Sequence, residues 1–308
     1  MKKSHELIQL EICERRGIIL DKEMESRLYN LRKGFKGEST VYQWFQKYSK
    51  QKIHIINDYW FYHGKNMQVD LLIILENRWI VVEVKNYYGY FEYREYECYL
   101  NGQLMSDNHF NQLAHRTQRL QHIANELNSN IKVESIMVFI DEHCDVYIES
   151  EISTKVIQRH QLKFYIESIT NSEQQSGRVP YINQIAGHLE KYKIASPFQP
   201  KLISDALEYN ALRTGINCAK CQSYYISIAY QSVRCHDCGH REYKKLVVSR
   251  LAVELCYIHY YHPEKITTKA IHELCGRGIS KRIIRKVMSN QYPRIGRGAN
   301  TYYDIKLD

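Results

Sequence analysis

The sequence predicts an α/β protein in which helices flank a mixed β-sheet, followed by a small basic module at the C-terminal end. Three observations lead to this prediction. The hydrophobic period of residues 20–195 switches from helical to strand spacing and back. Four cysteines form two close pairs late in the chain. The net charge of +9 comes entirely from residues 215–308, which hold 16 Lys and Arg against 7 Asp and Glu.

The hydrophobic pattern of the N-terminal part predicts helices before strands. Apolar residues between 7 and 12 indicate a first helix that ends at Gly17, and Asp21 caps a second helix. A third helix begins at Gly34. Strands are predicted at 53–57, 68–75, 78–84, 90–100, 134–140 and 146–148, and further helices at 108–128 and within 154–192. Glu76-Asn77 is the hairpin turn between the second and third strands, and Asn101-Gly102 is a second tight turn.

The organisation along the chain follows from these patterns. We expect N-terminal helices over 1–33, the α/β core over 34–150, and a helical extension with a linker over 151–200. Two prolines in Ser196–Pro200 mark the boundary. A metal-binding ribbon over 215–242 and a basic helical region over 243–308 follow.

Polar side chains interrupt two neighbouring strands of the core. Asp70 lies within the strand 68–75, and Glu83 and Lys85 lie at the end of the next strand. Alternation places Glu83 and Lys85 on one face, which Asp70 approaches if the strands pair as a hairpin. Two carboxylates bind Mg²⁺, and a lysine beside them stabilises charge on a phosphate under attack. This pattern predicts a metal site suited to phosphodiester cleavage.

Four ordered segments carry a family resemblance. They are Gly34-Phe-Lys-Gly-Glu38, Gln68-Val-Asp70, Val81-Val-Glu-Val-Lys-Asn-Tyr87 and Asn108-His-Phe-Asn-Gln112. The region 34–140 resembles the nuclease-related domain (NERD) branch of the PD-(D/E)xK nucleases, which implies a restriction-endonuclease-like fold. The resemblance implies that Asp70 and Glu83 bind Mg²⁺ or Mn²⁺ and that Lys85 is catalytic. It adds Glu38 as a further acidic residue, and Gln68 and Gln112 as polar residues of the site.

The chain departs from the family pattern at two positions. His109 stands where the family has Pro after the Asn of its last motif, and Val69 precedes Asp70 where the superfamily has Pro. The non-catalytic alternative is that Glu83 and Lys85 are solvent-exposed residues on an edge strand. Asp70 between apolar neighbours argues against it, because an unpaired buried carboxylate costs several kcal/mol.

The paired cysteines predict a zinc ribbon. Cys218 and Cys221 form one CxxC pair, Cys235 and Cys238 form the other, and 13 residues separate the pairs. Four thiolates in this spacing bind one structural Zn²⁺ and leave no open coordination position, so we expect no catalysis there. The odd total of nine cysteines argues against a disulfide framework and favours a reducing cytoplasm.

The C-terminal residues predict a DNA-binding helical pair. A helix over 245–260, a short helix over 267–275 and a basic helix over 280–290 precede a hairpin over 294–303, in the manner of a helix-turn-helix with a wing. The residues expected to contact DNA are Lys281, Arg282, Arg285, Lys286, Arg294 and Arg297. The alternative is a solvated basic helical hairpin packed on the ribbon.

These features together predict a cytoplasmic, Mg²⁺-dependent deoxyribonuclease whose zinc-stabilised module binds DNA. The longest apolar runs are far shorter than a membrane span of about 18 residues, and we expect no secretory signal and no membrane partner. One alternative is a non-catalytic DNA-binding protein whose nuclease-like domain is an interaction module. A second is an RNA-directed protein, since basic charge does not distinguish the two polymers. Cleavage mode, strand preference, biological role and oligomeric state are left open by the sequence.

Overall fold

The fold comes from a computed structural model of residues 1–308. It describes the chain except for residues 19, 76, 129, 172–178, 198–211, 261 and 308. The chain divides into two compact units. The first contains Met1 and Asn30–Phe198, and the second contains Lys2–Tyr29 and Gln199–Asp308. The N-terminal residues therefore belong with the C-terminal module, whereas the sequence suggested a separate helical segment over 1–33.

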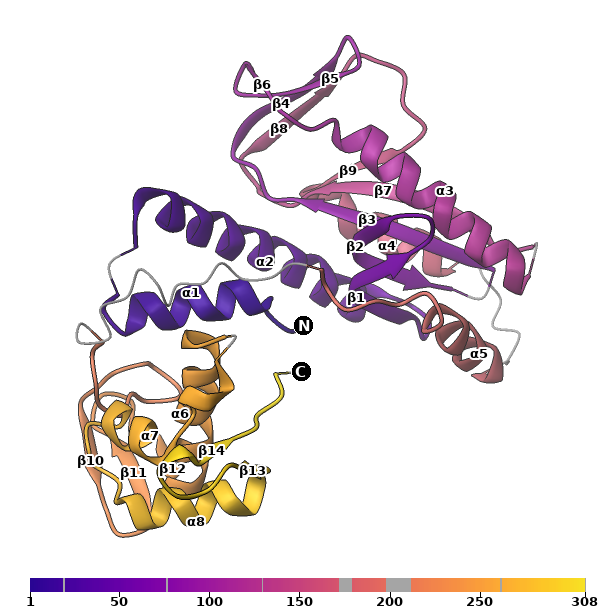
Figure 1. The fold of residues 1–308 in the computed structure, drawn as a ribbon. Coiled ribbons are helices and arrows are strands. Elements are labelled where there is room, and N and C mark those ends of the chain that lie inside the picture. The colour runs from indigo at the N-terminus through magenta and orange to yellow at the C-terminus, as the bar shows by residue number, and fades with distance from the viewer. Residues whose placement is uncertain are drawn as a thin grey trace. The chain divides into compact units, whose positions relative to one another are not determined.

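A five-stranded mixed sheet forms the centre of the first unit (Figure 1). Its strand order is β1-β2-β3-β7-β9, with β1 to β3 antiparallel and β3, β7 and β9 parallel. The strands are β1 (His54–Tyr62), β2 (Asn66–Ile74), β3 (Arg78–Lys85), β7 (Lys132–Phe139) and β9 (Lys155–Gln158). The predicted mixed α/β architecture is thus confirmed, although Glu76 of the expected turn lies outside the described residues.

Helices cover both faces of this sheet. On one face α3 (His109–Leu127) and α5 (Val179–Leu189) enclose a core that contains Trp79 and Val81. On the other face α2 (Lys22–Tyr48) and α4 (Arg159–Asn171) pack against Leu71, Ile80 and Val82. Alternate residues of β3 therefore enter opposite cores, which is why its sequence is apolar almost throughout.

Three local predictions differ from the structure. The two helices expected between residues 21 and 48 are one continuous helix, α2. The expected strand 90–100 is a hairpin of β4 (Gly89–Arg94) and β5 (Glu97–Leu100), because Glu95 and Tyr96 both have positive φ, as a tight turn requires. The helical interpretation of 154–192 missed β9 at its start. Together with β6 (Gln103–Leu104) and β8 (Cys144–Ile148), β4 and β5 form a second sheet.

The second unit combines a ribbon with a helical core. Its helices are α1 (His5–Arg15), α6 (Lys244–Ile258), α7 (Thr268–Leu274) and α8 (Lys281–Gln291), with a short helix η2 (Pro263–Lys265). Its strands are β10 (Ile226–Ile228), β11 (Ser232–Cys235) and β12 (Arg241–Tyr243) of the ribbon, and β13 (Arg294–Ile295) and β14 (Tyr302–Tyr303) of a hairpin that includes η3 (Gly298–Asn300). Leu251 and Leu255 of α6 lie in one core with Ile284 and Met288 of α8. The helix-turn-helix over α7 and α8 stays a prediction.

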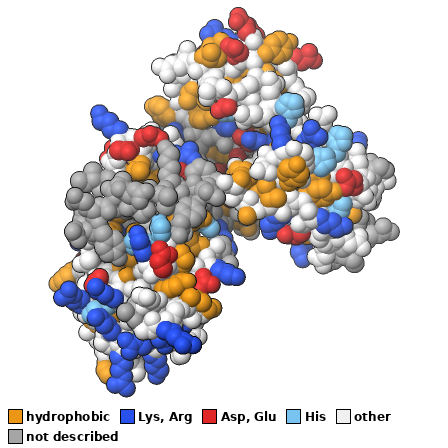
Figure 2. All heavy atoms as spheres, in the orientation of Figure 1, with side chains coloured by type: hydrophobic (Ala, Val, Ile, Leu, Met, Phe, Trp, Pro, Cys, Tyr) orange, Lys and Arg blue, Asp and Glu red, His pale blue; other side chains and the backbone are white. Residues whose placement is uncertain are grey.

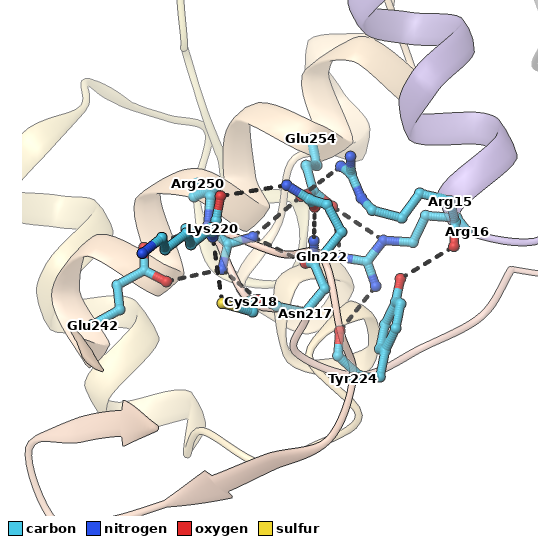
Figure 3. A network of polar contacts seen from close by, with 12 residues as sticks. Arg15, Arg16, Asn217, Cys218, Lys220, Gln222, Tyr224, Glu242, Arg250 and Glu254 are labelled. Carbon is cyan, nitrogen blue, oxygen red and sulfur yellow. Dashed lines mark hydrogen bonds and ion pairs between the residues drawn. The ribbon is translucent and has the colours of Figure 1, made fainter. Parts of the chain in front are cut away.

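A buried polar network joins α1 to α6 within the second unit (Figure 3). The guanidinium of Arg16 is fully buried and contacts Glu254 Oε2 at 2.6 Å, while Arg15 contacts Glu254 Oε1 at 3.0 Å. Arg250 donates to the side chain and the carbonyl of Asn217, the residue before Cys218. The network therefore supports the polypeptide that enters the cysteine cluster. No described helix has the length and apolar character needed to cross a membrane.

Candidate active site and metal centre

The β2–β3 hairpin places Asp70 opposite Glu83. Leu71 pairs with Val82, so the next residues outward along the hairpin are Asp70 and Glu83. Lys85 follows two residues later on the same face of β3. The parallel neighbour β7 ends beside it, because Lys85 pairs with Phe139. Three of the six residues predicted for the catalytic site, Asp70, Glu83 and Lys85, thus share one edge of the sheet.

Asp70 sits at an irregularity in β2. Val69 and Leu72, three residues apart, belong to the same core cluster, so the alternation of side chains shifts by one between them. The Asp70 carboxylate accepts a hydrogen bond from the main-chain N–H of Val84, with 2.8 Å between N and Oδ2. A side-chain oxygen thereby replaces a backbone acceptor at the end of the ladder. This contact holds the carboxylate against β3.

Glu83 has two cationic partners. Lys85 Nζ lies 2.9 Å from Oε1, and Arg116 of α3 lies 2.5 Å from Oε2. Burial favours the neutral acid, but the charges of Lys85 and Arg116 outweigh it and hold the pKa of Glu83 below its ordinary value. Burial likewise disfavours the charged amine, yet the Glu83 carboxylate raises the pKa of Lys85. Glu83 is therefore a carboxylate and Lys85 an ammonium at neutral pH.

The other two acidic residues have the opposite shift. Burial, then the charges of Glu83 and Glu38, raises the pKa of Asp70 well above its ordinary value. Burial, then the charges of Asp58 and Glu83, raises the pKa of Glu38 to about 7. Among the described residues neither Asp70 nor Glu38 forms an ion pair. Carboxylates that repel one another in this way favour a bound cation.

Gly37 explains how Glu38 reaches this edge of the sheet. A Cβ at position 37 would lie 2.9 Å from Cβ of Asn86 and 3.1 Å from Ile140, so only glycine lets α2 approach so closely. Asn86 in turn donates from its side chain to the carbonyl of Lys33 at 2.7 Å. Gly37 of α2 and Asn86, which follows β3, thus allow α2 to pack closely against the ends of β3 and β7.

The two predicted glutamines contact other groups. Gln68 Nε2 donates to Asp58 at 2.7 Å, and Gln112 Nε2 donates to Asp107 at 3.0 Å. Among the described residues, no hydrogen bond joins either amide to Asp70, Glu83 or Lys85. Both residues remain predicted members of the site.

Two charged residues near the centre were missed by sequence reasoning. Arg116 lies four residues after Gln112, one helical turn along α3, so helical spacing from that motif could have found it. Asp58 falls between the Asn57–Leu71 and Tyr59–Val69 pairs, hence opposite Asp70, and has φ of 49°. Only the register of β1 on β2 reveals it.

His109, the departure from the family pattern, is also beside the site. Its Nε2 shares a hydrogen bond of 2.8 Å with the hydroxyl of Tyr87. Burial and the positive charge of Lys85 lower the pKa of His109 to about 4. The ring is therefore neutral at pH 7 and adds no charge to the Glu83–Lys85 pair.

The oxygen atoms of Asp70 and Glu83 are ligands that a hard cation such as Mg²⁺ prefers. Among the described residues, however, they do not belong to a close cluster of three or more ligand atoms. In the described residues, the one group of three or more His, Cys, Asp or Glu ligand atoms lying within 4.8 Å of one another is the cysteine cluster. Mg²⁺ does not need such a cluster, since one or two carboxylates with water and substrate oxygens complete its shell. Asp70 and Glu83 are the residues that fit this role.

The four predicted zinc ligands come together in the second unit. The sulfur atoms of Cys218 and Cys238, and those of Cys221 and Cys235, are 3.5 Å apart. Tetrahedral Zn–S bonds of about 2.3 Å imply a separation of about 3.8 Å. Burial opposes the thiolate, yet hydrogen bonds from the main-chain N–H groups of Cys221 and Lys220 lower the pKa of Cys218 to about 7. The cluster fits a structural zinc site.

The predicted DNA-binding residues lie on exposed positions of α8 and the following hairpin. The six side chains named from the sequence are all exposed. Ile284 and Met288 form the buried stripe of α8, which turns the basic residues outward. Figure 2 shows Lys and Arg side chains gathered on the part of the second unit where α8 lies.

Comparison with known proteins gives one match. The family model described as nuclease-related domain (NERD) matches residues 33–140. No curated protein and no solved structure matches. The matched segment contains Glu38, Asp70, Glu83, Lys85 and Arg116, and its arrangement of helices on a mixed sheet agrees with a nuclease-like fold. Residues 33–140 of this chain are therefore similar to the nuclease-related domain family.

Proposed function

We propose that this protein is a divalent-metal-dependent nuclease that cleaves phosphodiester bonds of DNA. The observation that carries the proposal is the meeting of Asp70, Glu83 and Lys85 at one sheet edge. Burial first, and then the negative charges of Glu83 and Glu38, raise the pKa of Asp70 there. The family match supports nuclease-related chemistry in the same segment.

Each residue has a distinct part in this proposal. Asp70 and Glu83 would bind Mg²⁺ or Mn²⁺, with Glu38 adding negative charge beside them. Such an ion supplies Lewis-acid activation of the phosphate and a more acidic bound water. Lys85 is held as an ammonium by Glu83, so it stabilises negative charge that develops on the phosphate. Arg116 keeps Glu83 ionised and oriented.

The basic face of α8 supports DNA as the polymer held by the second unit. Four cations project from one short helix, and two arginines from the hairpin that follows. In helix-turn-helix proteins the second helix enters the major groove. We expect Arg282→Ala with Arg285→Ala to weaken duplex binding in a gel-shift assay, whereas Lys306→Ala, another exposed cation of this unit, has little effect.

Cleavage of supercoiled plasmid tests the enzymatic proposal. Purified protein with Mg²⁺ or Mn²⁺ should nick or degrade the plasmid, and chelation should stop it. Asp70→Ala and Lys85→Ala should each abolish cleavage, while Asp145→Ala, an exposed aspartate of the same unit, should retain it. Cleavage that persists in both variants would reject this site. An RNA substrate in parallel decides between the two polymers.

A non-catalytic nucleic-acid-binding protein is the second candidate. The observation in its favour is that both carboxylate oxygens of Glu83 already have cationic partners, Lys85 and Arg116. These cations offset the negative charge that a metal ion would need from Glu83. This candidate requires salt-sensitive DNA binding and no turnover with any divalent ion.

A further inference from the structure

One face of the zinc-ribbon sheet is open and carries a row of polar side chains. Ser227 of β10 pairs with Arg234 of β11, and Arg234 pairs with Arg241 of β12. Residues paired across antiparallel strands project to the same face. Ser227, Arg234 and Arg241 therefore lie side by side across the sheet, and all three are exposed.

This face carries the positive charges of Arg234 and Arg241. Among the described residues, no carboxylate forms an ion pair with Arg234 or Arg241. The acidic residues nearest in sequence are Glu242, whose side chain alternates to the other face and binds Arg250 at 3.0 Å, and Asp237, in the turn that follows β11. Arg241 donates from Nε to Ser232 Oγ at 2.8 Å, which leaves its terminal nitrogens for a ligand.

Aromatic rings flank the arginine row. Tyr225 and Tyr243 follow the same alternation and are 66% and 57% exposed. The ring of Tyr225 packs on His236 with centroids 4.4 Å apart and planes tilted by 32°. Tyr230, at the turn between β10 and β11, is 89% exposed. Rings held at this exposure beside cations are the groups that bind unpaired bases in proteins that hold single strands.

We propose that the open face of the β10–β11–β12 sheet binds single-stranded nucleic acid, with Arg234 and Arg241 on phosphates and Tyr225 and Tyr243 stacked on bases. A duplex offers phosphates to the arginines but keeps its bases stacked internally, so the tyrosines would gain nothing from it. The face thus differs in preference from α8, which suits a duplex groove. This inference rests on the proposed function in one respect, which is that the ligand is a nucleic acid.

Fluorescence anisotropy on the full chain tests this assignment. The probes are a labelled 20-nucleotide oligo-dT and a 20-base-pair duplex, without added Mg²⁺ so that no cleavage interferes. We expect the double variant Tyr225→Ala/Tyr243→Ala, which removes two stacking rings, to bind oligo-dT at least about 30-fold more weakly. Tyr243→Phe, which keeps the ring, should bind as the wild type does. Phe164→Ala, which removes an aromatic side chain 76% exposed on α4, is the matched control and should change nothing.

The salt dependence tests the arginines. Removing one phosphate contact on a single strand lowers the slope of log Kd against log salt by about 0.7. Arg234→Ala and Arg241→Ala should each produce that change for oligo-dT. Arg285→Ala/Lys286→Ala on α8 should weaken binding of the duplex more than binding of oligo-dT.

The result that overturns the proposal is unchanged oligo-dT affinity in the tyrosine double variant when its zinc content and circular dichroism match the wild type. Equal losses for oligo-dT and duplex would also overturn it. Loss of a protein partner by the same variant, with oligo-dT binding intact, would assign the face to protein recognition instead. Because binding is measured without turnover, an inactive protein that binds oligo-dT through this face still supports the inference.

Discussion

The carboxylate of Asp70 accepts a hydrogen bond from the main-chain N–H of Val84 across the end of the β2–β3 hairpin, with 2.8 Å between Oδ2 and N. This bond fixes the carboxylate next to Glu83, so the repulsion between the two acids is built into the fold. A site that stores such repulsion gives up stability for function.

Asp70→Asn should stabilise the protein and abolish cleavage. The asparagine oxygen can still accept from Val84, but the charge is gone. Since the folded-state pKa of Asp70 lies above its unfolded value, the ionised group destabilises the fold at neutral pH. We expect a gain of about 1 kcal/mol and a rise in Tm of a few degrees. Thermal unfolding and the plasmid assay measure the two effects, and a fall in Tm contradicts this account. Asp145→Asn should change neither.

Glu38 should set a pH dependence near neutrality. With a folded-state pKa of about 7 against about 4.3 in the unfolded chain, its contribution to stability is complete below pH 4 and is lost as the pH rises through 7. Glu38→Gln should therefore be more stable than the wild type at pH 8 but not at pH 4. Denaturant unfolding at both pH values measures this. Glu142→Gln, an exposed glutamate, is the control, and equal gains at both pH values would count against the shift.

Arg116 should act by positioning Glu83. Arg116→Ala removes one of two cations from the carboxylate, and loss of a residue that orients a metal ligand costs about 10-fold to 100-fold in metal affinity or rate. We expect a higher Mg²⁺ concentration at half-maximal cleavage, with partial recovery in Arg116→Lys. Arg119→Ala, exposed on the same helix, should retain the wild-type Mg²⁺ dependence. An unchanged Mg²⁺ requirement in Arg116→Ala would remove this role.

Zinc should be part of the folded second unit. The protein should contain one Zn²⁺ per chain, measured by mass spectrometry of the metal, and Cys235→Ser should lose it. Because binding of a structural zinc is coupled to folding, the metal-free protein should unfold at a lower temperature. Cys144→Ser in the first unit should keep its zinc. Retention of a full equivalent by Cys235→Ser would reject the four-cysteine site.

The Arg16–Glu254 pair should contribute strongly to the stability of the second unit. Arg16→Ala leaves Glu254 buried without one of its partners, and breaking a buried pair costs about 3–5 kcal/mol. Arg27→Ala breaks the more exposed Arg27–Glu6 pair of the same unit and should cost less than about 1 kcal/mol. Denaturant unfolding of the zinc-loaded protein compares the two. Similar losses in both variants would show that burial of Arg16 is unimportant.

Several elements of the site follow from local sequence. Asn108 predicts the start of α3 because its side chain caps the helix, accepting from Asn111 N–H. Alternation along β3 predicts that Glu83 and Lys85 share a face. The spacing of Cys218, Cys221, Cys235 and Cys238 predicts their cluster. In each case the prediction depends only on residues a few positions apart, or on two short CxxC segments.

Contacts across long sequence separations depended on the tertiary structure. Arg116 meets Glu83 only because α3 packs on that face of the sheet, and Asp58 faces Asp70 only in one register of β1 on β2. Arg16 joins a carboxylate 238 residues away, which draws the N-terminal helix into the C-terminal unit. Hydrophobic periodicity predicts which face of a helix or strand is buried, but it does not predict which other element packs against that face. The amino-acid order therefore determined the elements and their chemistry, while packing and register decided which charges meet.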